Sequence, residues 1–400
     1  MTRILRRIVL PLFLSLLPLA AQAEELLQSE MVFPLRKEHN HAPGIVELPN
    51  GDLLASWYRG DGERSADNVA IYGARLRKGD KQWSPDFLMA DYPGFPDCNT
   101  TMMIDRFGRL WLFWPIILDN HWESALTNYL VSADYMGPGS PHWFRSGVLF
   151  LKPEDFSNDA IAVLDDLVKK VGSKLSDKQQ QYVTKVKELL KNKLNQRLGW
   201  MPRCKPIILP TGRILLPLYC DTYSFSIMAV SDDDGRSWYA SKPLIGFGNI
   251  QPTVMRRKDG SLVAYMRENG LTDKIRVSES KDDGLTWGPV ESSVLPNPGA
   301  GIDGVVLRNG NWVLIYNDLT QGRNHLAVSL SDDDGKTWKW TRHLEQHPKG
   351  SYHYPAIIQG ADGAIHAIYS YFDDAKGKTM KHVGFTESWI REGDNAPAKK

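Results

Sequence analysis

The stretch TVMRRKDGSLVAYMRENGLTDKIRVSESKDDGLTW, residues 253–287, contains the two patterns that decide the fold of this 400-residue chain. Its first part is an apolar run, a turn at Gly260 and a second apolar run, which is typical of two antiparallel strands joined by a tight turn. Its last part, residues 280–287, fits S-x-D-x-G-x-[ST]-W. In such a box the Asp and Ser/Thr side chains can bond backbone groups, Gly adopts a positive φ, and Trp fills space between sheets. We therefore interpret the box as a folding device rather than as catalytic machinery.

The hairpin pattern recurs along the whole chain. Its six copies have the turn glycines Gly51, Gly108, Gly212, Gly260, Gly310 and Gly363. The box recurs at residues 231–238 and 331–338, with the same spacing as the hairpins. Degenerate copies of it end near Trp83 and Trp143. Two hairpins per repeat make a four-stranded blade, and six blades close into a β-propeller. The predicted fold class is all-β, a six-bladed propeller over residues 24–400.

One interval between the hairpins is too long for a single blade. Gly108 and Gly212 lie 104 residues apart, whereas the other intervals are 48 to 57 residues. From about residue 153 to 197 the strand pattern stops, and apolar residues recur at helical spacing. We predict a helical hairpin inserted between blades 2 and 3. It is either a lid or protein-partner surface beside a ligand site, or a helical pair that only packs on the flank of a blade.

The first 23 residues have the pattern of a signal peptide. Basic residues within positions 1–7 precede an apolar run, and Ala21-Gln22-Ala23 forms a small-x-small cleavage site. The run is too short for a comfortable membrane span, and no later stretch is long enough to be one. We therefore expect an exported protein, periplasmic or secreted, with no integral membrane span.

Composition excludes some classes of partner and cofactor. The 48 Lys and Arg residues balance 47 Asp and Glu residues, so no basic excess indicates nucleic-acid binding. The three cysteines, Cys98, Cys204 and Cys220, cannot all pair. A Cys204–Cys220 disulfide and buried free thiols both remain open. No Cys/His spacing resembles a zinc site, and we expect no metal and no other cofactor.

Six blades, three boxes and an export signal together resemble the sialidase (neuraminidase) superfamily over nearly all of residues 30–390. The superfamily uses three Arg residues to clamp a substrate carboxylate, a task that suits the planar guanidinium fork. By position, the resemblance assigns this role to Arg36 ahead of blade 1, Arg267 at the end of a blade 4 strand, and Arg323 before the last box. Arg59 and Arg64 are further candidates, which either hold the blade 1 loop or contact substrate.

The resemblance also implies a nucleophile and an acid/base residue. The nucleophile is a Tyr at the start of the last blade's inner strand, here Tyr354, with Tyr352 as the second choice. A neutral phenol suits attack beside a substrate carboxylate, which would repel a carboxylate nucleophile. The acid/base is an Asp in a blade 1 loop, here Asp67, with Asp61 and Glu63 as reserves.

One position departs from the family pattern. The Glu that polarises the nucleophile is replaced by Gln251, and an amide cannot accept a proton at neutral pH. Asp303, at the start of blade 5, is the expected substitute because the starts of inner strands converge on the propeller axis. Lys205, Asn99 and His41 are expected to face the same space. The departure makes the chain more similar to the bacterial predicted-neuraminidase branch, whose substrates are varied.

The resemblance implies a retaining exo-glycoside hydrolase with a Tyr nucleophile. It would remove a terminal ulosonic acid, such as sialic acid or 3-deoxy-octulosonic acid, from glycans or lipopolysaccharide. Two alternatives stay open: a hydrolase or lyase on another acidic polysaccharide, and a non-catalytic glycan-binding propeller. In each case the expected partner is an acidic glycan or glycolipid, and the helical insertion offers a surface for a protein partner.

Overall fold

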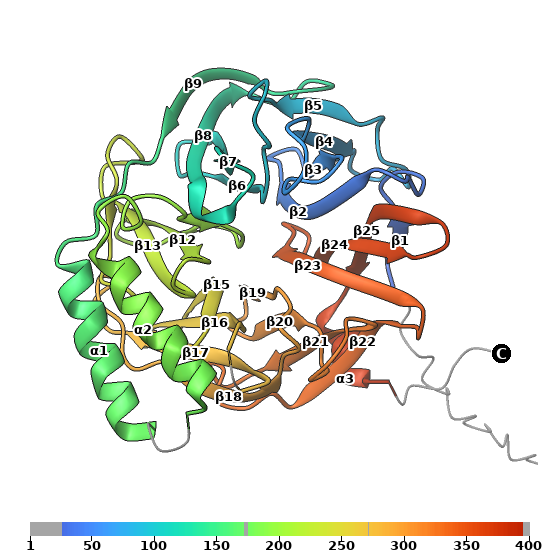
Figure 1. Ribbon diagram of the computed structural model, residues 1–400. Helices are drawn as coiled ribbons and strands as arrows, with labels where there is room; N and C mark the ends of the chain where they lie inside the picture. Colours follow the sequence, from blue (N-terminus) through green and yellow to red (C-terminus); the bar gives the residue numbers. More distant parts are fainter. Residues whose placement is uncertain (1–25, 172–174, 271, 395–400) are drawn as a thin grey trace, which may run out of the picture.

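The computed structural model describes residues 26–171, 175–270 and 272–394. Its strands form six antiparallel sheets, arranged side by side around a common axis (Figure 1). The predicted all-β fold with six propeller blades is thereby confirmed. The predicted signal peptide, residues 1–23, lies outside the described residues. Within them, no helix has the length and apolar character needed to cross a membrane.

Each blade runs from an inner strand at the axis to an outer strand at the rim. Blade 1 contains β2 (His39–Glu47), β3 (Leu53–Gly60), β4 (Ala70–Leu76) and β5 (Phe87–Ala90), and blade 2 contains β6 (Thr101–Ile104), β7 (Leu110–Ile117), β8 (Ala125–Asp134) and β9 (His142–Val148). Blade 3 begins with two short strands, β10 (Met201–Pro202) and β11 (Ile207–Ile208), which both pair with β12 (Ile214–Cys220). It continues with β13 (Phe225–Ser231) and β14 (Tyr239–Ala240). Blade 4 contains β15 (Asn249–Arg256), β16 (Leu262–Glu268), β17 (Lys274–Ser280) and β18 (Glu291–Pro296). Blade 5 contains β19 (Asp303–Val306), β20 (Trp312–Tyr316), β21 (His325–Ser331) and β22 (Trp340–Gln346). Blade 6 contains β23 (Gly350–Gln359), β24 (Ile365–Asp373) and β25 (Gly377–Phe385).

The N-terminal strand β1 (Gln28–Met31) closes the ring. It pairs with β25 and is the outer strand of blade 6, so the two ends of the propeller are held in one sheet. Pairing the first strand with the last blade completes the fourth strand of that blade and closes the ring. This closure was not part of the sequence prediction, because a four-residue strand carries little pattern of its own.

The boxes connect the third and fourth strands of blades 3, 4 and 5. In blade 5 the carboxylate of Asp333 accepts hydrogen bonds from the Thr337 backbone N–H at 2.9 Å, from the Thr337 hydroxyl at 2.6 Å and from the Ser331 hydroxyl at 2.8 Å. The Ser331 hydroxyl accepts from the N–H of Gly335, which has a φ of 79°. Trp338 then packs against Tyr265 of the neighbouring blade, with ring centroids 5.7 Å apart. These contacts agree with the interpretation of the box as a folding device.

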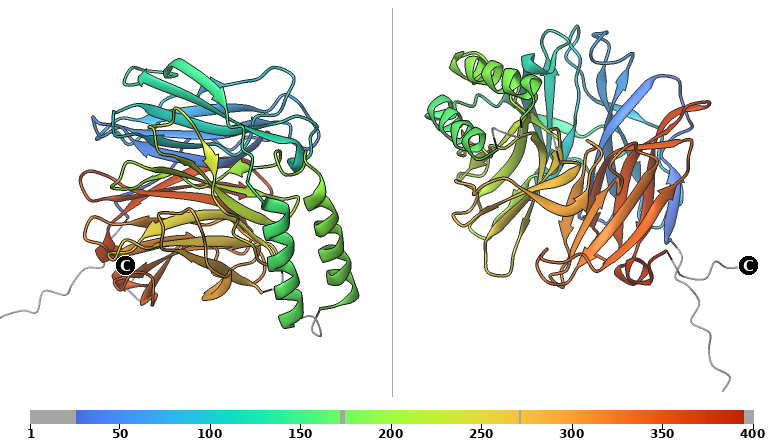
Figure 2. Two further views of the ribbon diagram at one scale, coloured as in Figure 1. Left: turned by 90° about the vertical axis from the view of Figure 1, so that its left-hand side faces the viewer. Right: turned by 60° about the horizontal axis from the view of Figure 1, so that its bottom comes forward.

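The helical insertion lies between blades 2 and 3, as predicted. Its helices α1 (Phe156–Val171) and α2 (Asp177–Lys191) stand side by side on the outside of the propeller (Figure 2). Helix α2 begins with a capping box, in which Ser176 and Gln179 exchange side-chain and backbone hydrogen bonds. The ring of Phe156 packs against Trp200 and Tyr223 of blade 3, at 5.6 and 5.4 Å between centroids. The structure therefore favours packing on the flank of a blade over a lid.

The remaining helical segments are short. They are η1 (Trp122–Ser124) in blade 2 and α3 (Glu387–Glu392) after the last strand. All three cysteines are buried free thiols, which decides between the two possibilities left open by the sequence.

Candidate active site

A cavity of about 650 Å³ opens at the propeller axis, on the face where the inner strands begin. All six blades contribute to its wall, which is the geometry expected of a propeller ligand site. No described residue of α1 or α2 belongs to it. Its lining residues are His39, His41, Tyr58, Glu63, Arg64, Asn99, Asn120, His121, Trp122, Glu123, Tyr219, Asp221, Ile250, Gln251, Arg267, Asn269, Arg323 and Tyr354.

A repeated backbone irregularity shapes the wall of this cavity. Ala42, Gln251 and Tyr354 have positive φ values of 51°, 55° and 46°, and each precedes a proline near the start of an inner strand. The strand register shifts at each of these positions, as it does at a β-bulge. Bulges redirect side chains, and positive φ at non-glycine residues is costly and concentrates at functional sites. Three X-Pro bulges in equivalent blade positions are therefore a sequence signal of the site that the repeat analysis did not use.

Tyr354 lies at the centre of a polar cluster. Its phenol oxygen accepts hydrogen bonds from Nη1 of Arg267 at 3.1 Å and from Nε2 of Gln251 at 3.3 Å. Burial of the phenol opposes its ionisation, but the charge of Arg267, the amide of Gln251 and the charge of Arg323 outweigh that penalty, so its pKa lies below the ordinary value. Gln251 thus stabilises a phenolate by donating to it, although it cannot remove the proton.

The ring of Tyr354 is held from two sides. The imidazole of His41 lies 4.5 Å from it between centroids, and the guanidinium of the buried Arg203 lies 5.0 Å from the ring centroid. Gly301 allows the close approach of the ring, since a Cβ at that position would lie 2.5 Å from Cδ1 of Tyr354. The phenol is therefore fixed in place and surrounded by positive charge.

Arg267 and Arg323 bring two guanidinium groups to the cavity with no carboxylate partner. Among the described residues neither forms an ion pair within 4.0 Å. Arg323 donates instead to Nδ1 of His353 at 2.7 Å and to the Gly299 carbonyl at 2.7 Å. The buried Nε of Arg267 has no hydrogen-bond partner at all. Burial and the charge of the neighbouring Arg267 lower the pKa of Arg323. An anion bound between the two guanidinium groups would therefore offset their mutual repulsion.

Glu63 is the acidic residue that the blade 1 loop presents to the cavity. Burial raises its pKa above the ordinary value for a carboxyl group. Its Oε2 lies 3.7 Å from Nε2 of His39, but burial and Lys378 lower the pKa of His39 to about 4. His39 is therefore neutral at pH 7, and the pair is not an ion pair under those conditions. A carboxyl group at the edge of a cavity whose pKa is raised by burial is a candidate general acid.

Asp67, the acid/base residue expected from the sequence, lies further along the same loop. It is exposed, accepts a hydrogen bond from Nδ2 of Asn120 at 3.2 Å, and is not among the residues that line the cavity. Asp61 is likewise absent from the lining and accepts from Asn68 at 2.8 Å. The conformation of this loop thus brings Glu63 to the cavity in preference to either aspartate.

Arg36 and Arg59 lie together outside the cavity. The guanidinium of Arg36 binds the Asp86 carboxylate through two hydrogen bonds of 2.8 and 3.0 Å. Arg59 contacts the same carboxylate and stacks on Tyr72, with its guanidinium carbon 3.5 Å from the ring centroid. Hydrogen bonding from Arg36 lowers the pKa of Asp86 to about 2. The structure does not bring these two residues to Tyr354, whereas it places Arg64 in the cavity wall.

Asp303 and Lys205 form a separate buried pair beside the axis. Nζ of Lys205 lies 2.9 Å from the Asp303 carboxylate, which also accepts from the Thr253 hydroxyl at 2.8 Å and the Ile357 N–H at 3.0 Å. Neither residue lines the cavity. The carboxylate of Asp303 therefore connects blade 5 to blades 3, 4 and 6 instead of contacting the phenol of Tyr354.

The charged groups Arg203, Asp221 and Glu123 at the site escaped the sequence prediction. Arg203 lies beneath Tyr354 and donates to the Pro355 carbonyl at 2.8 Å, whereas the prediction for this blade was Lys205. Asp221 follows the end of β12, and burial raises its pKa despite the nearby charge of Arg267. Counted from the turn glycines Gly212 and Gly260, it occupies the position in blade 3 that Asn269 occupies in blade 4, so a comparison of second-strand ends could have found it.

Comparisons with known proteins agree with this architecture. Residues 174–367 match the family model of the BNR repeat-like domain. A 182-residue segment is 25% identical to the anhydrosialidase of Macrobdella decora, a match that covers 40% of this chain and 24% of that protein. The chain thus matches about a quarter of the length of this relative.

Two solved structures share the fold. A protein of unknown function from Dyadobacter fermentans is 15% identical, with a TM-score of 0.68 and coverage of 90% of this chain and 98% of that one. The NanB sialidase of Streptococcus pneumoniae is 13% identical, with a TM-score of 0.67 and coverage of 90% and 71%. The blades, the boxes and the match over residues 174–367 make the chain similar to propellers with BNR repeats, and the solved structures share its fold.

Proposed function

We propose that this protein is a retaining exo-glycoside hydrolase that acts on a terminal sugar with a carboxylate on its anomeric carbon. The observation that carries the proposal is the position of Tyr354, whose phenol oxygen accepts from Arg267 beside a second guanidinium, Arg323, that has no carboxylate partner within the described residues. A substrate carboxylate held by these two groups would lie next to the nucleophile. Such sugars include sialic acid and 3-deoxy-octulosonic acid.

The reaction would proceed in two steps. Tyr354 first loses its proton to solvent, and its phenolate oxygen then attacks the anomeric carbon while Glu63 gives a proton to the leaving glycosidic oxygen. Glu63 then removes a proton from water, which releases the sugar from the tyrosine with overall retention of configuration. The lowered pKa of Tyr354 supports attack without a dedicated carboxylate base, which is the function that Gln251 cannot supply.

Glu63 takes precedence over Asp67 as the proposed acid/base because it lines the cavity and its pKa is raised by burial. We expect Glu63→Gln to lower kcat about 10²- to 10⁴-fold on a natural glycan, whose leaving group needs a proton. The loss should be small on a 4-methylumbelliferyl glycoside, whose leaving group needs little protonation.

The pH profile gives a second readout of the same residue. A general acid must be protonated, so the rate on a natural glycan should fall as the pH rises through the pKa of Glu63, and the raised pKa moves this alkaline limb to higher pH. Glu63→Gln should abolish the limb. Asp67→Asn is the matched control on the same loop, and if it reproduces both effects while Glu63→Gln does not, the assignment to Glu63 is wrong.

The proposed function is tested with two substrates. Purified protein is incubated with 4-methylumbelliferyl sialic acid and, separately, with a lipid-linked 3-deoxy-octulosonic acid acceptor, and the released sugar is followed by NMR. Release from one of them, with the first product in the retained configuration, is the expected result. An anhydro sugar as product would indicate an activity of the kind for which the anhydrosialidase of Macrobdella decora is named. Failure to release either sugar, combined with retained binding of acidic glycans, would favour a non-catalytic binding propeller.

A further inference from the structure

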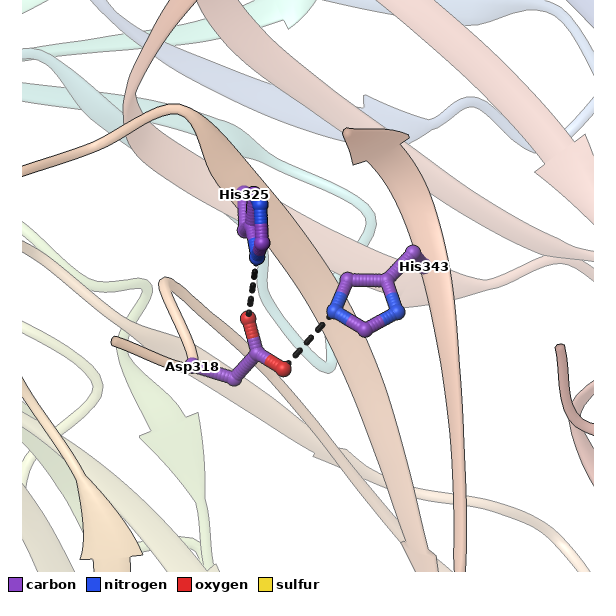
Figure 3. Close-up of side chains that lie close together, drawn as sticks. All are labelled: Asp318, His325 and His343. Atoms are coloured by element: carbon purple, nitrogen blue, oxygen red, sulfur yellow. Dashed lines mark hydrogen bonds and ion pairs between the residues drawn. The ribbon is translucent and has the colours of Figure 1, made fainter. Parts of the chain in front are cut away.

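A cluster of two histidines and one aspartate lies at the outer part of blade 5, away from the cavity. Asp318 follows strand β20, His325 begins β21, and His343 lies in β22 (Figure 3). Their side chains point toward one another, and one ligand atom from each lies within 4.8 Å of the other two. None of the three lines the cavity at the axis.

The geometry points to a binding site for a divalent transition ion such as Zn²⁺, and we propose that Asp318, His325 and His343 are its ligands. Oδ2 of Asp318 lies 2.7 Å from Nε2 of His343, and Oδ1 lies 3.9 Å from Nδ1 of His325. Tetrahedral ligands about 2.0–2.2 Å from zinc lie roughly 3.4 Å from one another, so these separations bracket the required value. Small side-chain rotations would suffice to admit an ion.

An unsatisfied oxygen supports a ligand at this place. Oδ1 of Asp318 is buried and has no hydrogen-bond partner, an unusual state for a carboxylate oxygen. Nδ1 of His325, 3.9 Å away, is too distant for a hydrogen bond. A cation between Asp318 and His325 would satisfy this oxygen and the imidazole nitrogen at once.

The surroundings of His343 match those of a metal-bound imidazole. Its second ring nitrogen, Nδ1, lies 2.5 Å from Oδ2 of Asp394, and Oδ1 of Asp394 accepts from the backbone N–H of His343 at 2.9 Å. Histidines that bind metals usually donate their other ring N–H to a carboxylate, which fixes the tautomer and the orientation of the ring. Two imidazoles and one carboxylate are a donor set that suits zinc.

The position of the cluster suggests what the ion would do. Asp318 and His325 flank the loop that carries Arg323, and Asn317 holds the base of this loop by donating to the His325 carbonyl at 2.6 Å. An ion shared by Asp318 and His325 would join the two ends of the loop, and His343 would tie them to β22. The ligands come from three separate elements, so the spacing of histidines and cysteines in the sequence could not indicate the site.

The test measures metal binding directly and does not depend on the activity proposed above. Chelator-treated full-length protein is dialysed against micromolar Zn²⁺ and its metal content is measured, and Co²⁺ is added in parallel to record the visible bands of a tetrahedral site. The wild type should bind one ion and melt at a higher temperature with Zn²⁺. His325→Ala and Asp318→Asn should each weaken binding by at least about tenfold and remove the thermal shift.

The matched control is His142→Ala, which removes an exposed histidine that also faces an aspartate, Asp134 at 3.5 Å. It should bind the ion like the wild type. Absence of binding by the wild type would overturn the proposal, as would equal affinity in His325→Ala and the wild type. Either result would leave the cluster as an ion-pair network that attaches residue Asp394 to blade 5. If either His325→Ala or Asp318→Asn loses its native melting transition, the comparison with the wild type uses the other variant.

Discussion

Tyr354→Phe is expected to lose turnover by a factor on the order of 10³ or more, with a melting temperature close to that of the wild type. The substitution removes only the oxygen that would attack the anomeric carbon. The ring keeps its contacts with His41 and Arg203, and the hydrogen bonds lost are those with Gln251 and Arg267 at the wall of a solvent-filled cavity. Steady-state kinetics on a released sugar, together with a thermal melt, provides the measurement.

Tyr352→Phe is the matched control for this experiment. Tyr352 lies two residues earlier on the same strand, is fully buried, and its hydroxyl has no hydrogen-bond partner. Its ring packs against Tyr369 at 6.2 Å between centroids, away from the cavity. The variant should therefore retain activity. If Tyr352→Phe is inactive and Tyr354→Phe is active, the nucleophile has been assigned to the wrong tyrosine.

Arg323→Ala is expected to weaken the binding of carboxylate sugars by about 2–4 kcal/mol, or roughly 30- to 1,000-fold in Kd. The half-buried guanidinium lies beside Arg267 and is not neutralised by an acidic side chain of the described residues, so a bound carboxylate would gain most of its attraction from these two groups. Isothermal titration with the free acid sugar measures the loss. The amide or ester of the same sugar should bind the variant and the wild type with similar affinity.

Arg36→Ala separates two versions of the carboxylate clamp. The family resemblance assigns Arg36 to the clamp, whereas the structure pairs its guanidinium with Asp86 outside the cavity. We expect this variant to bind carboxylate sugars within about threefold of the wild type, because an ion pair of this kind contributes mainly to local stability. A loss comparable to that of Arg323→Ala would return Arg36 to the clamp and require the loop around it to move on binding.

Local patterns in the chain were sufficient to predict the blades. Each hairpin needs only alternating apolar residues and a glycine turn, and each box is satisfied by its own Ser, Asp and Thr side chains, as the contacts of Asp333 show. The helical insertion is equally local, since α2 is capped by Ser176 at its own start. The strand β1 was missed because its partner β25 lies at the other end of the sequence.

The residues of the candidate site also fall into a group that could be anticipated and a group that could not. The resemblance to the sialidase superfamily led us to place Tyr354, Gln251, Arg267 and Arg323 at the axis, and all four line the cavity there. The conformation of the irregular blade 1 loop decides whether Glu63 or Asp67 faces these residues. The repeats do not predict this conformation, because the loop is not part of the repeated strand pattern.

The sequence by itself determined the number of blades and the place of the helical insertion, since hydrogen bonding and apolar periodicity within one blade specify these features. The nucleophile candidate came from the family resemblance. Only the tertiary structure decided which charges meet. Arg36 forms an ion pair with Asp86, Asp303 forms one with Lys205, and Glu63 lines the cavity. The physical reason is that charge pairing acts between segments distant in the chain, so its outcome depends on packing that no short stretch of sequence contains.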